Sequence, residues 1–162
     1  MVYINLMGRI NFYLLVFIAI FAVSCGSGPI TVQRQNETRL EVQQFIENLN
    51  QIIASSNYNA WREVLSPELF AKYSSEEYLR QRSEQLARAG RGARELRTAE
   101  DYFMHVVVPA RRNLAYRVDD IEFITLDRVN AFTVTHRDGE EIRLLLFNLE
   151  RINNSWAIIY GE

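Results

Sequence analysis

The chain has 162 residues, of which 48% are apolar and 23% are charged, with 18 basic and 20 acidic side chains. The net charge of −2 argues against nucleic acid as a partner, because nucleic-acid-binding proteins usually carry a strong positive charge. The length suits a single domain with one hydrophobic core.

Residues 1–24 have the pattern of a signal peptide. Arg9 precedes an apolar, uncharged run from Asn11 to Val23, and Ser24 supplies a small residue before the expected cleavage point. A membrane-spanning helix needs about 20 apolar residues, so this shorter run predicts a cleaved leader. A start at Met1 or at Met7 would give the same mature protein.

Cys25 follows this leader directly and is the only cysteine of the chain. The residues Ala22-Val23-Ser24-Cys25 resemble the lipobox of bacterial lipoproteins, with Ala22 standing where leucine is usual. The resemblance implies that Cys25 carries a diacylglycerol and that the new N-terminus is acylated with a chain such as palmitate. Each buried CH₂ contributes about 0.8 kcal/mol, so two or three acyl chains would anchor the protein in a membrane.

The mature chain is expected to consist of a lipidated tether, residues 25–35, and one α+β domain, residues 36–162. The tether contains glycine and proline and shows little periodicity. Gly26 stands where lipoproteins retained at the inner membrane often have aspartate. We therefore expect the protein at the outer membrane of the cell envelope, facing the periplasm.

The first half of the domain is predicted to be helical. An apolar stripe at helical spacing runs from Val42 to Ile53. Helix starts are predicted where polar residues can cap a first turn, namely at Asn57, at Ser66-Pro67-Glu68, at Ser74 with Glu77, and at Thr98. The helix from Ser74 should end at Gly90, and that from Thr98 should reach Phe103.

The second half is predicted to form four strands, 114–126, 128–136, 141–152 and 155–160. Asp138-Gly139 and Asn153-Asn154 are expected at tight turns, since these residue types tolerate positive φ. The third strand carries apolar residues at both its odd and its even positions, which predicts that both of its faces are covered. In the first strand, the alternation of apolar and polar residues shifts by one position across Asp119-Asp120, which predicts a bulge there.

Helices followed by an antiparallel meander predict an α+β domain with helices packed on a curved sheet. Several short motifs resemble those of bacterial envelope lipoproteins with a nuclear-transport-factor-2-like domain: Tyr58-x-x-Trp61-x-x-x-Leu65-Ser66-Pro67-Glu68, Asp101-Tyr102-Phe103, Val106–Arg111 and Arg117–Ile124. The resemblance covers about residues 37–160. It implies a cone of helices around a bent sheet, often with a pocket at the open end.

Such a pocket makes Trp61, Tyr102 and His105 the candidate ligand-binding residues. On a helix, Asp101, Tyr102 and His105 would share one face and could serve as an acid/base set. The alternative is that the aromatic rings pack in the core and that His105 lies where the chain turns into Val106–Val108. We favour packing, because aromatic residues at helical spacing usually belong to the core.

Two charged clusters have similar alternatives. Asp119, Asp120 and Glu122 could share a proton, although solvent-facing acids at a bulge are the more ordinary interpretation. Six arginines between residues 80 and 97 could bind an anionic headgroup or an acidic partner, or could simply form a solvated helix face and loop. The two histidines are 31 positions apart and lie in no metal-ligand motif, so we expect neither a metal nor a cofactor.

Three functions remain as hypotheses. The leading one is a lipid-anchored envelope protein whose domain binds a protein partner or a small apolar ligand without catalysis. The second is an acid/base isomerase or dehydratase that uses His105 and Tyr102 in the cone. The third is a structural subunit of an envelope complex.

Overall fold

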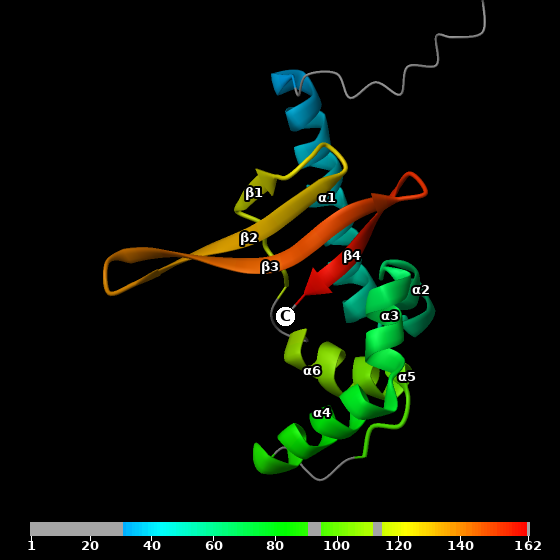
Figure 1. Ribbon diagram of the computed structural model, residues 1–162. Coiled ribbons are helices and arrows are strands. Elements are labelled where there is room, and N and C mark those ends of the chain that lie inside the picture. Colours follow the sequence, from blue (N-terminus) through cyan, green and yellow to red (C-terminus); the bar gives the residue numbers. More distant parts are fainter. Residues whose placement is uncertain (1–30, 91–94, 112–114, 162) are drawn as a thin grey trace, which may run out of the picture. The chain divides into compact units, whose positions relative to one another are not determined.

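A computed structural model describes residues 31–90, 95–111 and 115–161 of the chain. The predicted signal peptide, Cys25 and the first part of the tether lie outside these residues. Figure 1 shows the described elements, with the helices first in chain order and the sheet after them.

The first half of the domain is helical, as predicted. Its elements are α1 (Val32–Ala54), α2 (Tyr58–Glu63), α3 (Pro67–Ser74), α4 (Glu76–Arg88), α5 (Ala99–Tyr102), the π-helical segment η1 (Phe103–Val107) and α6 (Val108–Arg111). Thr31 caps α1 by accepting a hydrogen bond from the Arg34 N–H at 3.3 Å. Helix α1 therefore includes residues 32–35, which were predicted to belong to the tether.

Most of the predicted caps are confirmed. Asn57 caps α2, Ser66 caps α3 with Pro67 in its first turn, and Thr98 forms a capping box with Asp101. The prediction for α4 was wrong by one residue, because Ser75 accepts from the Tyr78 N–H at its start. The Ser74 hydroxyl donates instead to the Phe70 carbonyl of the preceding helix, at 2.8 Å.

The second half forms a four-stranded antiparallel sheet in the order β1-β2-β3-β4. The strands are β1 (Asp120–Phe123), β2 (Arg128–Arg137), β3 (Glu140–Ile152) and β4 (Ser155–Gly161). Both predicted turns are confirmed, since Asp138, Gly139, Asn153 and Asn154 all have positive φ. Successive positive φ values suit the two-residue turns whose twist matches a hairpin.

The first predicted strand was too long. Only residues 120–123 form β1, and their pairing with β2 is continuous, so the bulge expected at Asp119-Asp120 is absent. The register shifts elsewhere. Between Ala131 and Phe132 the β3 partner jumps from Phe147 to Leu145, which leaves Leu146 as an extra residue on β3.

One face of the sheet is covered and the other is polar. Helix α1 crosses the covered face in Figure 1. Core residues come from both elements: Val42, Ile46 and Leu49 from the helix, and Val129, Ala131, Phe147 and Leu149 from the sheet. The opposite face carries Asn130, which donates to Glu122 at 2.8 Å and accepts from Asn148.

The prediction that the third strand is covered on both sides was therefore wrong. Leu144 at the beginning of β3 is 49% exposed. The fold class is α+β, as predicted, with a sheet that twists without strong curling in Figure 1. A closed cone is not part of the described architecture.

Candidate functional site

The three candidate residues lie on different elements that meet near one cavity. Trp61 on α2 and Tyr102 at the end of α5 are 3% and 6% exposed, and their ring centroids are 6.4 Å apart. His105 is half-buried in η1 and is not among the residues that line the cavity. The structure thus brings together Trp61 and Tyr102 but not the full predicted set.

Aromatic rings form a continuous cluster around these two residues. Trp61 stacks on Phe103 with a centroid distance of 4.9 Å and on Tyr73 with 5.9 Å. Tyr102 contacts Tyr73 at 5.0 Å and meets Tyr78 edge-on at 5.4 Å. Buried aromatic pairs in offset or edge arrangements stabilise a core by about 0.5–1.5 kcal/mol each beyond burial, so these rings act as packing anchors.

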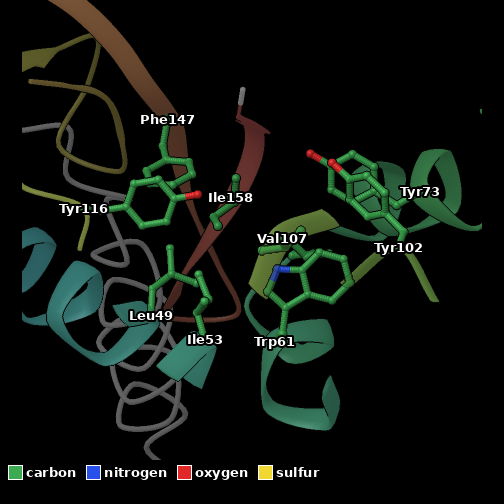
Figure 2. A pocket seen from close by; sticks show the side chains of 10 residues that line it. Leu49, Ile53, Trp61, Tyr73, Tyr102, Val107, Tyr116, Phe147 and Ile158 are labelled. Atoms are coloured by element: carbon green, nitrogen blue, oxygen red, sulfur yellow. The ribbon is translucent and has the colours of Figure 1, made fainter. Parts of the chain in front are cut away.

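A cavity of about 40 Å³ lies between this cluster, α1 and the sheet. In Figure 2, Trp61, Tyr73, Tyr102 and Val107 lie on one side, and Tyr116, Phe147, Leu49 and Ile53 lie on the other. Leu65 and Ile158 complete the lining. A small-molecule site typically encloses about 300–1,000 Å³, whereas this space suits at most a few water molecules.

Tyr116 reaches the cavity through an interaction that the sequence did not indicate. The Asn50 side chain on α1 donates to the Tyr116 carbonyl at 2.9 Å and accepts from its N–H at 2.8 Å. This two-point contact fixes an irregular segment against α1. The Tyr116 ring then meets Phe147 edge-on at 4.7 Å, and the Arg111 guanidinium lies 4.0 Å from its centroid.

The phenol groups of the cluster form a short hydrogen-bond chain. The Arg82 Nε donates to the Tyr78 hydroxyl at 3.2 Å, which donates to the Tyr102 hydroxyl at 3.2 Å. Burial raises the pKa of Tyr73, and burial together with the bond to Tyr102 raises the pKa of Tyr78. Both phenols are therefore neutral at physiological pH, which makes them poor general bases.

Asp101 is committed to the start of α5. Its carboxylate accepts the Arg97 and Thr98 backbone N–H groups, both at 3.0 Å. The bond from the Arg97 N–H and those from Thr98 hold the Asp101 pKa below its ordinary value. A further, smaller electrostatic contribution to this lowered pKa comes from His105, so Asp101 and His105 lie near each other, whereas the Tyr102 ring packs among other aromatic rings. The predicted turn after His105 was wrong, because η1 and α6 continue the helix to Arg111.

Each acid of the predicted cluster has its own partner. Asp119 accepts from the Val134 N–H at 2.8 Å and pairs with Arg117, Asp120 pairs with Arg143 at 2.6 Å, and Glu122 bonds Asn130. The Val134 N–H and the Arg117 guanidinium hold the Asp119 pKa below its ordinary value. The arrangement gives no shared proton.

The described arginines of the predicted basic cluster are also engaged. Arg80 pairs with Glu77 and Glu84, Arg88 with Glu84, and Arg97 with Glu95. Arg82 lies over the Tyr78 ring, 5.6 Å from its centroid. Arg91 and Arg94 lie outside the described residues. Within residues 31–90, 95–111 and 115–161, no group of three metal-ligating side chains lies together.

A second surface was not identified from the sequence. We call residues 133–146 the arm, because in this part of the hairpin β2 and β3 pair only with each other. The arm extends from the domain at the left of Figure 1. It carries the exposed Leu144 and the half-buried Ile142 on one face. The arm therefore combines apolar side chains with a part of the β3 edge that β4 does not cover among the described residues, and such an edge can pair with another chain.

These features describe an α+β domain with a packed aromatic core and a projecting hairpin, in a chain whose sequence also contains the lipobox-like residues that end at Cys25. The chain is 34% identical over 134 residues to a protein from Treponema pallidum (strain Nichols) named "uncharacterized lipoprotein"; the matched region covers 83% of this chain and 67% of that protein. The chain therefore belongs to the family of this treponemal lipoprotein, and it is a lipoprotein.

Two further comparisons add nothing to this assignment. No protein-family model matches the chain, and no solved structure matches it. Among the helices in the described part of the chain, none is both long and apolar enough to cross a membrane.

Proposed function

We propose that this protein is anchored in the cell envelope through lipid on Cys25 and that its domain binds a protein partner without catalysis. The anchor rests on the lipobox-like residues and on the relationship to a named lipoprotein. Outer-membrane attachment facing the periplasm belongs to the same proposal, on the basis of Gly26. A nuclear-transport-factor-2-like domain also remains a proposal, supported by the order of helices and meander.

The observation that carries the binding function is the arm. Leu144 is 49% exposed on a hairpin that is not covered by β1 or β4. A protein partner that covered Leu144 and Ile142 would remove apolar surface from water, at about 25 cal/mol for each Å². The hairpin also offers backbone groups for strand pairing, which is a common mode of peptide recognition.

A protein partner fits the geometry better than a small apolar ligand. The aromatic cavity holds about 40 Å³, and its ring contacts are those of a packed core. The acid/base alternative also fits the geometry less well than a protein partner, since Asp101 caps α5 and His105 is not among the residues that line the cavity. The proposed working surface is therefore the arm.

Site-specific photo-crosslinking in native membranes tests this proposal. A photoreactive amino acid at Leu144 should give a discrete crosslinked species that contains a second protein. The matched control is the same amino acid at Leu40, an exposed leucine on α1 that is 60% exposed. Equal yields from both positions, or none from Leu144, would argue against the arm as a binding surface.

A further inference from the structure

The outer edge of β3 within the arm has a defined set of backbone groups facing outward. On the other strand, Val134 donates its N–H to Asp119 at 2.8 Å, and its carbonyl accepts from the Arg117 guanidinium at 3.4 Å. Both groups of Val134 thus point away from β3. Its partner across the hairpin, Arg143, must then point its own N–H and C=O away from β2.

The two-residue period of a strand extends this orientation to Glu141 and Leu145. Three residues of β3, at positions 141, 143 and 145, therefore present their N–H and C=O groups to the free edge. Among the described residues, strand β4 pairs with β3 from Phe147 onward. Within the described residues, no backbone hydrogen bond reaches the edge from 140 to 146. By contrast, Asp119 and Arg117 occupy the β2 edge of the arm.

The charges along this edge are self-complementary in one antiparallel register. In a symmetric antiparallel pair, a residue whose backbone groups face outward must lie opposite a residue of the same kind in the other copy. The two-fold axis of the pair can therefore pass beside residue 141, 142, 143 or 144. A centre at Ile142 places Glu141 of each copy opposite Arg143 of the other. A centre at 141 or 143 opposes like charges, and a centre at 144 would bring Glu141 against Phe147, which already pairs with β4.

We propose that two copies of this chain associate by antiparallel pairing of their β3 edges, centred on Ile142. Arg143 already bonds Asp120 at 2.6 Å and lies 3.6 Å from the Phe132 centroid. A guanidinium has five N–H donors, so Arg143 has donors left for a facing Glu141. The two Ile142 side chains meet as a non-hydrogen-bonded pair and cover one another.

Membrane attachment, which is part of the proposed function and on which this step rests, would strengthen the pairing. Two copies held in one membrane meet at a raised effective concentration, so a short edge suffices for association. The pairing also closes an open strand edge, which otherwise invites uncontrolled aggregation.

Disulfide trapping in the full lipidated protein tests the register. In a non-hydrogen-bonded antiparallel pair the Cα atoms lie about 4.5 Å apart, a distance compatible with a disulfide. Ile142→Cys should therefore give a covalent dimer in membranes under mild oxidation. Thr135→Cys, directly across the hairpin from Ile142 but one strand further from the proposed axis, is the matched control. Equal dimer yields from the two variants would overturn the proposal.

Charge reversal tests the cross-strand pairs, and Glu141→Arg is the decisive single variant because it leaves the bond between Arg143 and Asp120 in place. In the Ile142→Cys protein, Glu141→Arg or Arg143→Glu alone should weaken dimer association about tenfold, because both cross-strand pairs become like-charged. The double reversal should restore it. A dimer yield that Glu141→Arg leaves unchanged would contradict the proposed register. A strong Leu144 crosslink to another protein with no Ile142 dimer would overturn self-pairing and leave the proposed function standing.

Discussion

At the scale of single residues, Tyr102 illustrates a side chain held by packing. Its ring contacts Trp61, Tyr73 and Tyr78, and it is 6% exposed. Tyr102→Ala should lower the free energy of unfolding by about 3–5 kcal/mol, as is usual for a buried aromatic residue. Tyr102→Phe keeps the ring and removes the hydroxyl bond to Tyr78, so it should cost about 1 kcal/mol. Urea unfolding of the two variants measures the difference.

Equal losses in the two Tyr102 variants would mean that the hydroxyl, not the ring, dominates this contact. Such a result would revive a chemical role for the phenol. A small loss in both variants would mean that the cluster repacks easily.

Asp119 provides a pH-dependent test at the same scale. Its pKa is lowered in the folded protein by the Val134 N–H and the Arg117 guanidinium. A lowered folded-state pKa means that the contribution of Asp119 to stability is present above the ordinary aspartate pKa of about 3.9. The contribution is lost as the pH falls through the folded-state value. Asp119→Asn should therefore lower the urea midpoint at pH 7.

The difference between wild type and Asp119→Asn should shrink as the pH is lowered below 4 and disappear once the carboxylate is protonated. Asp138→Asn is a suitable control, since Asp138 is an exposed turn residue. A difference that stays constant from pH 7 to the acid range would show that the charge of Asp119 is not what supports Val134.

At the scale of elements, the β3–β4 turn is a position where a substitution that better suits the backbone conformation should stabilise the protein. Asn153 and Asn154 have φ values of 49° and 65°. Tight hairpin turns of this kind favour Asn-Gly, because glycine adopts positive φ without a steric cost. Asn154→Gly should raise the free energy of unfolding by about 0.5–1 kcal/mol, measured by denaturant unfolding.

The expected sign depends on where the residue lies. Asn130→Gly, within β2, should destabilise the protein, because glycine in a strand interior loses entropy and packing. Destabilisation by both substitutions would indicate that the Asn154 side chain makes a contribution beyond its backbone conformation.

Local signals made several elements predictable from the sequence. The caps at Asn57, Ser66 and Thr98 and the turns at Asp138 and Asn153 depend on residues within about three positions of each other. Such short-range interactions can be predicted from the local sequence alone. Elements whose structure depends on residues far away in the sequence were harder to predict.

The errors have physical causes of this second kind. Residues 115–119 read as a strand, yet the Asn50 side chain of α1 binds the backbone of Tyr116 there. The third strand is apolar on both parities, yet its first half projects beyond β4. The error at Ser74 is local instead: both serines are capping residues by type, but α3 continues through Ser74, so Ser75 is the residue that caps α4.

The candidate site was predicted in part. Aromatic spacing identified Trp61 and Tyr102 as neighbours in a core, but it gave no measure of the space between them. The size of the cavity depends on Tyr116 and Phe147, which come from distant parts of the chain. The arm was missed because its exposure follows from the lengths of β1 and β4, not from its own residues.

At the scale of the whole molecule, the proposed membrane attachment depends on Cys25. Cys25→Ala should remove the lipid attachment and leave a longer precursor or a soluble form, since no other cysteine can be modified. Metabolic labelling with a palmitate analogue, followed by detergent partition, measures the change. A wild-type protein that takes up no label would contradict lipid anchoring on Cys25.

In the proposed function, the arm of this lipoprotein binds the partner and the aromatic cavity does not. Capture of the full lipidated protein from solubilised membranes tests this most directly, with Leu144→Thr altering the arm and Tyr102→Phe altering the cavity. We predict that Leu144→Thr lowers recovery of the bound partner about tenfold, while Tyr102→Phe recovers it as wild type does. Loss of the partner in Tyr102→Phe with full recovery in Leu144→Thr would contradict binding through the arm.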